Sequence, residues 1–301
     1  MTDLLGALPG AVAQGIIWGI MAIGVYITYK VLDIADLTVD GSICTGAAVC
    51  TMMMLSGQSP WLSVFCAVLA GIAAGSITGF LHVLLGIPAI LAGILTQMVL
   101  WSLNLKILGK ANQAISSRSN PVILSQMDID SALIVLAIFA VVTVAVLYLY
   151  FGTEIGCAIR ATGSNPVMSR AQGINTGLTK ILGLAISNGI VALSGALLCQ
   201  YQGYTDINMG RGAVVIGLAA VVIGEVLAKR ISTNFAVRLF GVIAGAIVYY
   251  VVYQIIIFSG FDTDLLKMFS AIVVALFLGI PYLRKKLRAA HSVSKRGAQN
   301  A

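Results

Sequence analysis

Long apolar stretches recur along nearly the whole chain, and they constrain its fold more than any other feature. A membrane-spanning helix needs roughly 17–25 predominantly apolar residues. The apolar stretches occupy 12–29, 43–55, 61–85, 90–108, 132–151, 178–198, 213–228, 235–258 and 268–282. Only 10% of the residues are charged, whereas about a quarter are charged in a soluble domain. The sequence therefore predicts an all-α integral membrane protein with about nine transmembrane segments.

The second and seventh stretches are too short to cross a bilayer as straight helices. They cover residues 43–55 and 213–228, whereas a crossing takes about 20 residues. A helix that breaks within a membrane frees backbone groups, which protein or a water-filled path must then satisfy. We therefore expect these two segments to be broken or partly re-entrant, as in many transporters.

The 18 lysine and arginine residues are distributed unevenly between alternate loops. If the C-terminus is cytoplasmic, most of them fall on the internal side, including those of the basic tail at 284–301. The opposite side carries few cations and several aspartates, which is the asymmetry that the positive-inside rule expects. This placement accounts for the net charge of +7 without a nucleic-acid partner, and it predicts a cytoplasmic C-terminus. With an odd number of crossings, the N-terminus then lies outside.

An internal repeat emerges when the sequence is shifted by 170 positions against itself. The blocks that align are Gly19–Ile23 with Gly189–Leu193, Asp36–Val39 with Asp206–Met209, and Gly71, Ala74 and Gly75 with Gly241, Ala244 and Gly245. Because an odd number of crossings separates the paired helices, the two halves insert with opposite orientation. We predict two inverted four-helix repeats, at 10–108 and 178–283, joined by one helix at 130–151. Gly71 and Gly75 also form a row with Gly79 that predicts close helix packing.

Both halves contain a polar break directly before the short apolar segment. In the first half the break covers Asp36–Ser42, with carboxylates at Asp36 and Asp40. Their oxygens could cap the following helix, or the break could line the solute route, since ionisable residues within membrane proteins usually face the interior. The other polar side chains that we place on this route are Thr96, Gln97, Asn104 and Asn188. Each of them could instead form a hydrogen bond between helices.

The polar segment 152–180 reads GTEIGCAIRATGSNPVMSRAQGINTGLTK. Asn165 and Pro166 form a turn signal. Ser164 is placed to cap a short helix over Val167–Gln172 that ends at Gly173. Such a helix, lying along the cytoplasmic face, could act as a lever for a partner protein, although an ordinary basic loop remains the alternative.

Within this segment, Arg160–Pro166 followed by Ala171–Ile174 resembles the coupling segment of bacterial ABC-importer permeases. The similar branch contains the branched-chain amino acid, ribose and simple-sugar or nucleoside permeases, and it has a motif similar to Asp36–Ser42. The likeness covers nearly the whole chain. It is closest to a tryptophan- or tyrosine-type permease subgroup, in which, unlike the sugar permeases, an aspartate such as Asp40 stands directly before Gly41.

The resemblance implies one transmembrane permease domain over residues 1–301. Its expected partners in the bacterial cell membrane are two ABC ATPase subunits holding ATP and Mg, an extracellular solute-binding protein, a second permease copy in a homodimer, and the lipid. The residues expected to couple the chain to the ATPase are Arg160, Gly163, Ser164, Asn165, Pro166 and Gly173. Arg160 would pair either with an acidic group of the ATPase or with Glu154. No Gly-x-x-x-x-Gly-Lys-Ser/Thr loop occurs, so we assign ATP hydrolysis to another chain and no cofactor to this one.

These features predict the permease subunit of an ATP-driven importer, not an enzyme, with an aromatic amino acid as the expected solute. A sugar or nucleoside importer is the alternative within this class. An ion-coupled secondary transporter is the alternative outside it, with Asp36, Asp40, Asp206 or Glu225 holding the ion or proton. The five cysteines lack CxxC spacing and the two histidines lack ligand-spaced neighbours, so no metal site is expected.

Overall fold

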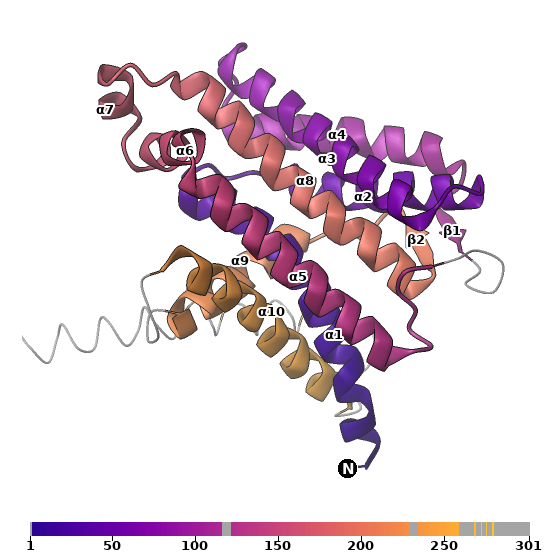
Figure 1. Ribbon diagram of the computed structural model, residues 1–301. Helices are drawn as coiled ribbons and strands as arrows, with labels where there is room; N and C mark the ends of the chain where they lie inside the picture. The colour runs from indigo at the N-terminus through magenta and orange to yellow at the C-terminus, as the bar shows by residue number, and fades with distance from the viewer. Residues whose placement is uncertain are drawn as a thin grey trace, which may run out of the picture.

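The computed structural model describes residues 2–115, 122–228 and 234–258, and the single positions 268, 272, 275 and 279. These residues form a bundle of helices with one short antiparallel two-stranded sheet, whose strands are far apart in the sequence (Figure 1). The elements are α1 (Thr2–Tyr26), the π-helical turn η1 (Ile27–Val31), α2 (Val39–Leu55), α3 (Pro60–Val83), α4 (Ala89–Leu108), β1 (Asn112–Ala114), α5 (Ile129–Gly152), α6 (Glu154–Ser164), α7 (Pro166–Ala171), α8 (Thr176–Gln202), β2 (Tyr204–Asp206), α9 (Ala213–Ala228) and α10 (Phe235–Phe258).

Within the described residues, six helices are long and apolar enough to cross a membrane: α1 continued by η1, α3, α4, α5, α8 and α10. The two short apolar helices expected from the sequence are also present. α2 has 17 residues and α9 has 16, fewer than the roughly 20 of a full crossing. The chain is thus a multi-pass membrane protein. The predicted ninth segment at 268–282 lies outside the described residues apart from isolated positions, and the basic tail at 284–301 lies wholly outside them.

α1 and α8 form the buried centre of the bundle. In their apolar windows 83% and 72% of the residues are buried, against 28–39% in the other four spanning helices. α8 packs directly on α3, since its backbone oxygens fill the space that a Cβ would need at Gly71 and Gly75. At Gly79 an added Cβ would lie 2.9 Å from the Cα of Ile181. The prediction that this glycine row serves close helix packing is confirmed.

A non-helical break precedes each short helix. In the first, residues 32–38 lie between η1 and α2. In the second, Gly203 ends α8 in the left-handed conformation (φ 75°), and β2 and a turn lead to Gly212 (φ 87°) and α9. Because lipid offers no hydrogen bonds, both breaks need partners inside the protein, and those partners define the candidate site.

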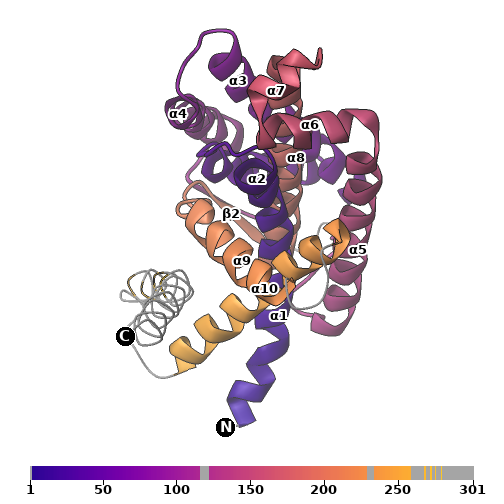
Figure 2. The same ribbon diagram turned by 90° about the vertical axis from the view of Figure 1, so that its left-hand side faces the viewer.

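The two short helices run in opposite directions from the middle of the bundle. α6 and α7 lie at one end, away from the β1–β2 sheet and from the N-terminus (Figures 1 and 2). α2 leads toward the β1–β2 sheet, where the hydroxyl oxygens of Thr51 and Thr205 lie 2.6 Å apart. α9 leads toward the α6 end, where Glu225 forms a 3.3 Å ion pair with Lys30.

Candidate functional site

Asp40 joins the starts of the two short helices. It lies in the first turn of α2, and its carboxylate accepts backbone hydrogen bonds from Gly212 (3.0 Å) and Val214 (3.0 Å) at the start of α9. A carboxylate is favourable there, since a helix N-terminus carries partial positive charge and unpaired N–H groups. The Asp40 carbonyl lies against Gly210, where a Cβ would collide with it. The N-terminal ends of α2 and α9 therefore meet inside the bundle.

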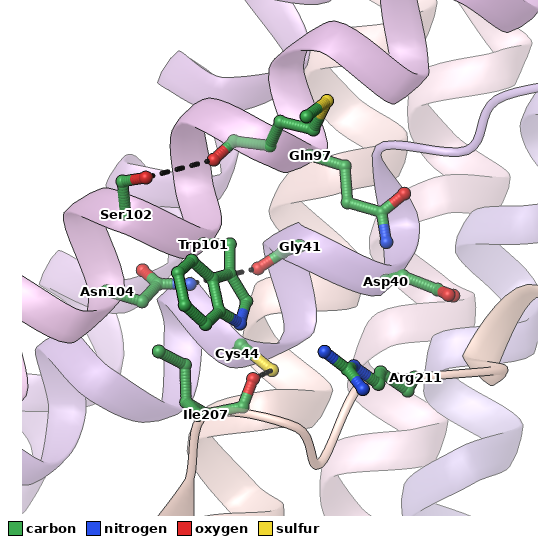
Figure 3. A pocket seen from close by; sticks show the side chains of 10 residues that line it. Asp40, Gly41, Cys44, Gln97, Trp101, Ser102, Asn104, Ile207 and Arg211 are labelled. Carbon is green, nitrogen blue, oxygen red and sulfur yellow. Dashed lines mark hydrogen bonds between the residues drawn. The ribbon is translucent and has the colours of Figure 1, made fainter. Parts of the chain in front are cut away.

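A cavity of about 460 Å³ lies beside this junction (Figure 3). Its walls come from α2, α4 and the second break, and its lining residues are Asp40, Gly41, Cys44, Gln97, Met98, Trp101, Ser102, Asn104, Ile207 and Arg211. In Figure 3 the Gln97 amide extends from α4 toward Asp40, and the Arg211 guanidinium points toward Cys44 and Trp101, while the Asp40 carboxylate is directed to the start of α9. The cavity thus combines a cation, a carboxylate, side-chain amides and an indole ring.

Asn104 leaves a polar atom unpaired at the cavity. The side chain is fully buried, and its Nδ2 donates to the Gly41 carbonyl at 3.5 Å. Its Oδ1 has no hydrogen-bond partner among the described residues. An unsatisfied buried acceptor costs about 1–3 kcal/mol.

Asp36 is bound into the packed interior and does not line this cavity. Its Oδ1 accepts the Thr38 N–H at 2.8 Å, and its Oδ2 accepts from the Asn188 amide of α8 at 2.7 Å. Asn188 in turn accepts from the Ser42 hydroxyl at 2.6 Å. This chain of bonds ties the first break and the start of α2 to the central helix α8.

The sequence therefore predicted part of the cavity. Three of the route candidates line it, namely Asp40, Gln97 and Asn104, while three do not, namely Asp36, Thr96 and Asn188. Thr96 donates to the Ala92 carbonyl of its own helix at 3.0 Å. Trp101 and Arg211 were missed. Trp101 could have been found from its helical spacing, since Gln97, Trp101 and Asn104 share one face of α4. Arg211 could have been found from its position between two glycines of the second break.

The predicted coupling segment forms two short helices, α6 and α7, at one end of the bundle. Helix α6, which the sequence did not predict, extends through Ser164. The prediction that Ser164 caps the next helix is therefore wrong. Asn165 is the first residue outside α6, and its side chain caps α7 by accepting the Met168 N–H at 3.0 Å. Pro166 then occupies the first turn of α7, where its missing N–H is not needed.

α7 presents apolar side chains to the outside of the protein. Val167 is 77% exposed and Met168 is 57% exposed. The helix is held against α8 by a 2.6 Å hydrogen bond from Arg170 Nε to the Thr176 hydroxyl. Gly173, with φ 83°, forms the turn between the two helices. A firmly held helix with exposed apolar residues is suited to contact a partner protein.

Gly163 places α6 directly on the first break. A Cβ at this position would collide with the Val31 carbonyl oxygen and lie 2.8 Å from the Cα of Leu32. Only glycine permits this approach between two backbones. The predicted coupling segment therefore touches the chain a few residues before Asp36 and Asp40.

Arg160 folds back onto the end of α5. Its Nη2 donates to the Phe151 carbonyl at 2.8 Å and lies 3.3 Å from the Cys157 sulfur. Its guanidinium also lies 6.0 Å from the centroid of the Phe235 ring. The described part of the chain shows no ion pair between Arg160 and Glu154, so of the two predicted pairings only the one with an ATPase remains open.

These features define a class of protein, a multi-pass membrane transport protein with a non-helical break before each of two short helices and, beside their junction, a cavity lined by both polar and apolar side chains. The profile of the family described as "Branched-chain amino acid transport system / permease component" matches residues 8–280. The chain belongs to this family. It is the permease subunit of an ABC importer and not an enzyme, and the ATPase of the system is a separate chain.

Named relatives agree with this assignment. The chain is 37% identical over 285 residues to the tyrosine transport system permease protein of Clostridioides difficile (strain R20291), covering 94% of each chain. It is 33% identical over 284 residues to an uncharacterized protein of Rickettsia prowazekii, covering 94% of this chain and 99% of the relative. A more distant relative is the autoinducer 2 import system permease of Salmonella typhi, 27% identical over 213 residues, which are 69% of this chain and 59% of the relative. No solved structure matches the chain.

Proposed function

We propose that this permease carries an amino acid, with aromatic amino acids as its preferred class, and that the cavity beside Asp40 forms part of the solute route. One observation carries the proposal: Asp40, Arg211 and Trp101 face one cavity at the junction of the two broken helices. The C. difficile relative, whose name specifies tyrosine transport, supports the same solute class.

The chemistry of the cavity suits a zwitterion with an aromatic side chain. The Arg211 guanidinium is a good partner for a carboxylate, because it presents several donors in one plane. Asp40 attracts an ammonium group, and its two oxygens offer about four acceptor positions, of which the α9 backbone uses two. The Trp101 ring provides a flat apolar surface.

We further propose that the permease domain is built from the two inverted repeats predicted at 10–108 and 178–283. Several contacts at equivalent positions support this. Asp36 and Asp206 each accept, through Oδ1, the N–H two residues further on, at 2.8 and 2.7 Å. Asp40 and its equivalent Gly210 touch each other. The paired helices α1 and α8 are also the two most buried spans.

The repeat suggests how α6 and α7 drive transport. The ATPase would bind the exposed face of α7 and move α6, which presses on the first break through Gly163. That break leads to Asp40, whose carboxylate holds the start of α9. Movement of α6 would thus reach both short helices and shift the open side of the cavity, which is alternating access by rocking of the two halves.

The assembly that follows contains a second permease copy, an extracellular solute-binding protein and two ATPase subunits with ATP and Mg. The α6–α7 end and the C-terminus face the cytoplasm, as the distribution of basic residues expects. The joining helix corresponds to α5, and the coupling segment to 152–180.

Two observations weigh against the alternatives. A sugar or nucleoside has no carboxylate and ammonium pair for Arg211 and Asp40 to separate. In an ion-coupled carrier, one of the four acidic candidates would hold the ion or proton. The carboxylates of Asp36, Asp40 and Asp206 already accept hydrogen bonds from the protein, and Glu225 is paired with Lys30.

Uptake of labelled solutes tests the proposal. Cells lacking their own copy of the chain would be supplied with the wild type, Arg211→Gln, Arg211→Lys or the control Lys110→Gln. We expect wild-type cells to take up tyrosine, phenylalanine or tryptophan in preference to ribose and nucleosides. Arg211→Gln should lower this uptake about tenfold or more, because it removes a charge-assisted hydrogen bond, and Lys110→Gln should not. Preferential uptake of a sugar would overturn the proposed solute class, and equal uptake by Arg211→Gln and wild type would overturn the proposed role of the cavity.

A further inference from the structure

A second cavity, of about 430 Å³, lies at the end of the bundle that carries α6. Three cations line it, each from a different element: Lys30 of η1, Arg160 of α6 and Arg238 of α10. Hydroxyl groups of Tyr26 and Ser164 also face it, and none of its described lining residues is acidic. Three cations brought together from distant parts of the chain favour a bound anion.

The positive charge is only partly neutralised by the protein itself. Lys30 forms a 3.3 Å ion pair with Glu225, and 45% of the Lys30 side chain stays exposed. Arg160 uses Nη2 for the Phe151 carbonyl, which leaves its other N–H groups for a ligand. Arg238 interacts with the Tyr26 hydroxyl, a neutral group. Among the described residues, Arg160 and Arg238 therefore have no acidic partner within the cavity.

A neighbouring cavity of about 530 Å³ shares Arg160 and Phe235 with this basic one and has a mixed lining that includes the aromatic and aliphatic side chains of Tyr148, Leu149 and Phe151. Its wall includes the end of the spanning helix α5, where Leu149 is 72% exposed and Tyr148 is 46% exposed. A phosphate in the basic cavity would thus have exposed apolar side chains directly beside it. An acidic side chain of a soluble protein would use the first cavity and leave the second empty, whereas a phospholipid would fill both.

We propose that these joined cavities bind an anionic phospholipid, with its headgroup phosphate among Lys30, Arg160 and Arg238 and its chain against Leu149. Basic pockets between transmembrane helices commonly take such headgroups on the cytoplasmic side. The site does not depend on which solute the permease carries. Because Ser164 and Gly163 also line the basic cavity, the bound lipid would brace α6 against the first break.

Thermal unfolding of the purified importer, its ATPase subunits included, tests the site. Added probes would be phosphatidylglycerol, phosphatidylcholine with the same chains, and inorganic phosphate. We expect phosphatidylglycerol alone to raise the unfolding temperature, with an apparent affinity about tenfold lower in Lys30→Gln and in Arg238→Gln. Arg238→Lys, which keeps the charge, and Lys106→Gln, at a cation outside the cavity, should resemble the wild type.

Native mass spectrometry gives a second readout, since the two neutralising variants should retain fewer co-purified anionic lipids than Lys106→Gln. An equal effect of phosphatidylcholine would mean that any lipid suffices, and an equal effect of inorganic phosphate would mean a free-anion site. Either result contradicts the proposal, as does unchanged lipid retention in both variants. A phosphatidylglycerol effect seen only after removal of the ATPase would assign the cavity to an acidic segment of that partner and would also overturn it.

Discussion

Replacing Gly163 by alanine should separate ATP hydrolysis from transport without unfolding the protein. The added Cβ would collide with the Val31 carbonyl oxygen, and neither backbone can turn away as a flexible side chain would. Overpacking of this kind costs about 1–3 kcal/mol. If α6 relieves the clash by moving off the break, its seated position loses about 5- to 150-fold in population.

Gly152→Ala is the matched control, because an added Cβ there meets no atom within 4 Å. Both variants would be reconstituted with their ATPase and solute-binding protein in vesicles, and the ratio of solute moved to ATP hydrolysed would be measured beside thermal unfolding. Gly163→Ala should lower this ratio at least about fivefold while still binding the ATPase, and Gly152→Ala should leave it unchanged. A wild-type ratio in a folded Gly163→Ala permease would refute the mechanical link between α6 and the first break.

Further predictions concern stability and packing, measured by thermal unfolding of the purified permease. Asp40→Ala leaves two N–H groups at the start of α9 without their acceptor and should cost about 1–2 kcal/mol, whereas Asp40→Asn, which keeps one acceptor oxygen, should cost less; equal losses would argue against the cap. Asn188→Leu removes the donor to the buried Asp36 carboxylate and should cost about 2–3 kcal/mol. An unchanged unfolding temperature would contradict the hydrogen bond between α8 and Asp36. Gly75→Ala should destabilise by about 1–3 kcal/mol because α8 backbone fills the site, while Gly6→Ala, where nothing lies within 4 Å, should not.

Much of the fold could be predicted from the sequence because lipid imposes simple requirements. Spanning helices must be long and apolar, so their positions follow from composition alone. The short stretches that become α2 and α9 were recognisable by length, and the glycine row of α3 by its spacing. Helix α6 was not predicted from the sequence because Gly156 and Gly163 lower its helix propensity. The close contact between Gly163 and the first break explains the glycine at this position, and only the tertiary structure reveals that contact.

The candidate site was less accessible to sequence reasoning. A polar residue in an apolar segment indicates an interior position, but it does not tell a solute-facing side chain from one bonded to a neighbouring helix. Asp36 and Asp40 illustrate the difficulty, since they lie in one short motif and yet bind different helices, α8 and α9. Arg211 comes to line the same cavity as Asp40 only because two breaks far apart in the chain meet.

We propose that the exposed face of α7 attaches this permease to a separate ATPase, and co-purification tests this attachment most directly. The tagged chain would be isolated from its native membrane in mild detergent as wild type, as Val167→Asp with Met168→Asp, and as the control Met127→Asp. Val167, Met168 and Met127 are all more than half exposed. Met127 lies just before the start of α5, whereas α6 and α7 follow the end of α5. We predict that an ATPase is recovered with the wild type and with the control, and that it is lost from the α7 variant while the permease stays folded. Recovery of the ATPase with all three chains, or with none of them, would contradict the account.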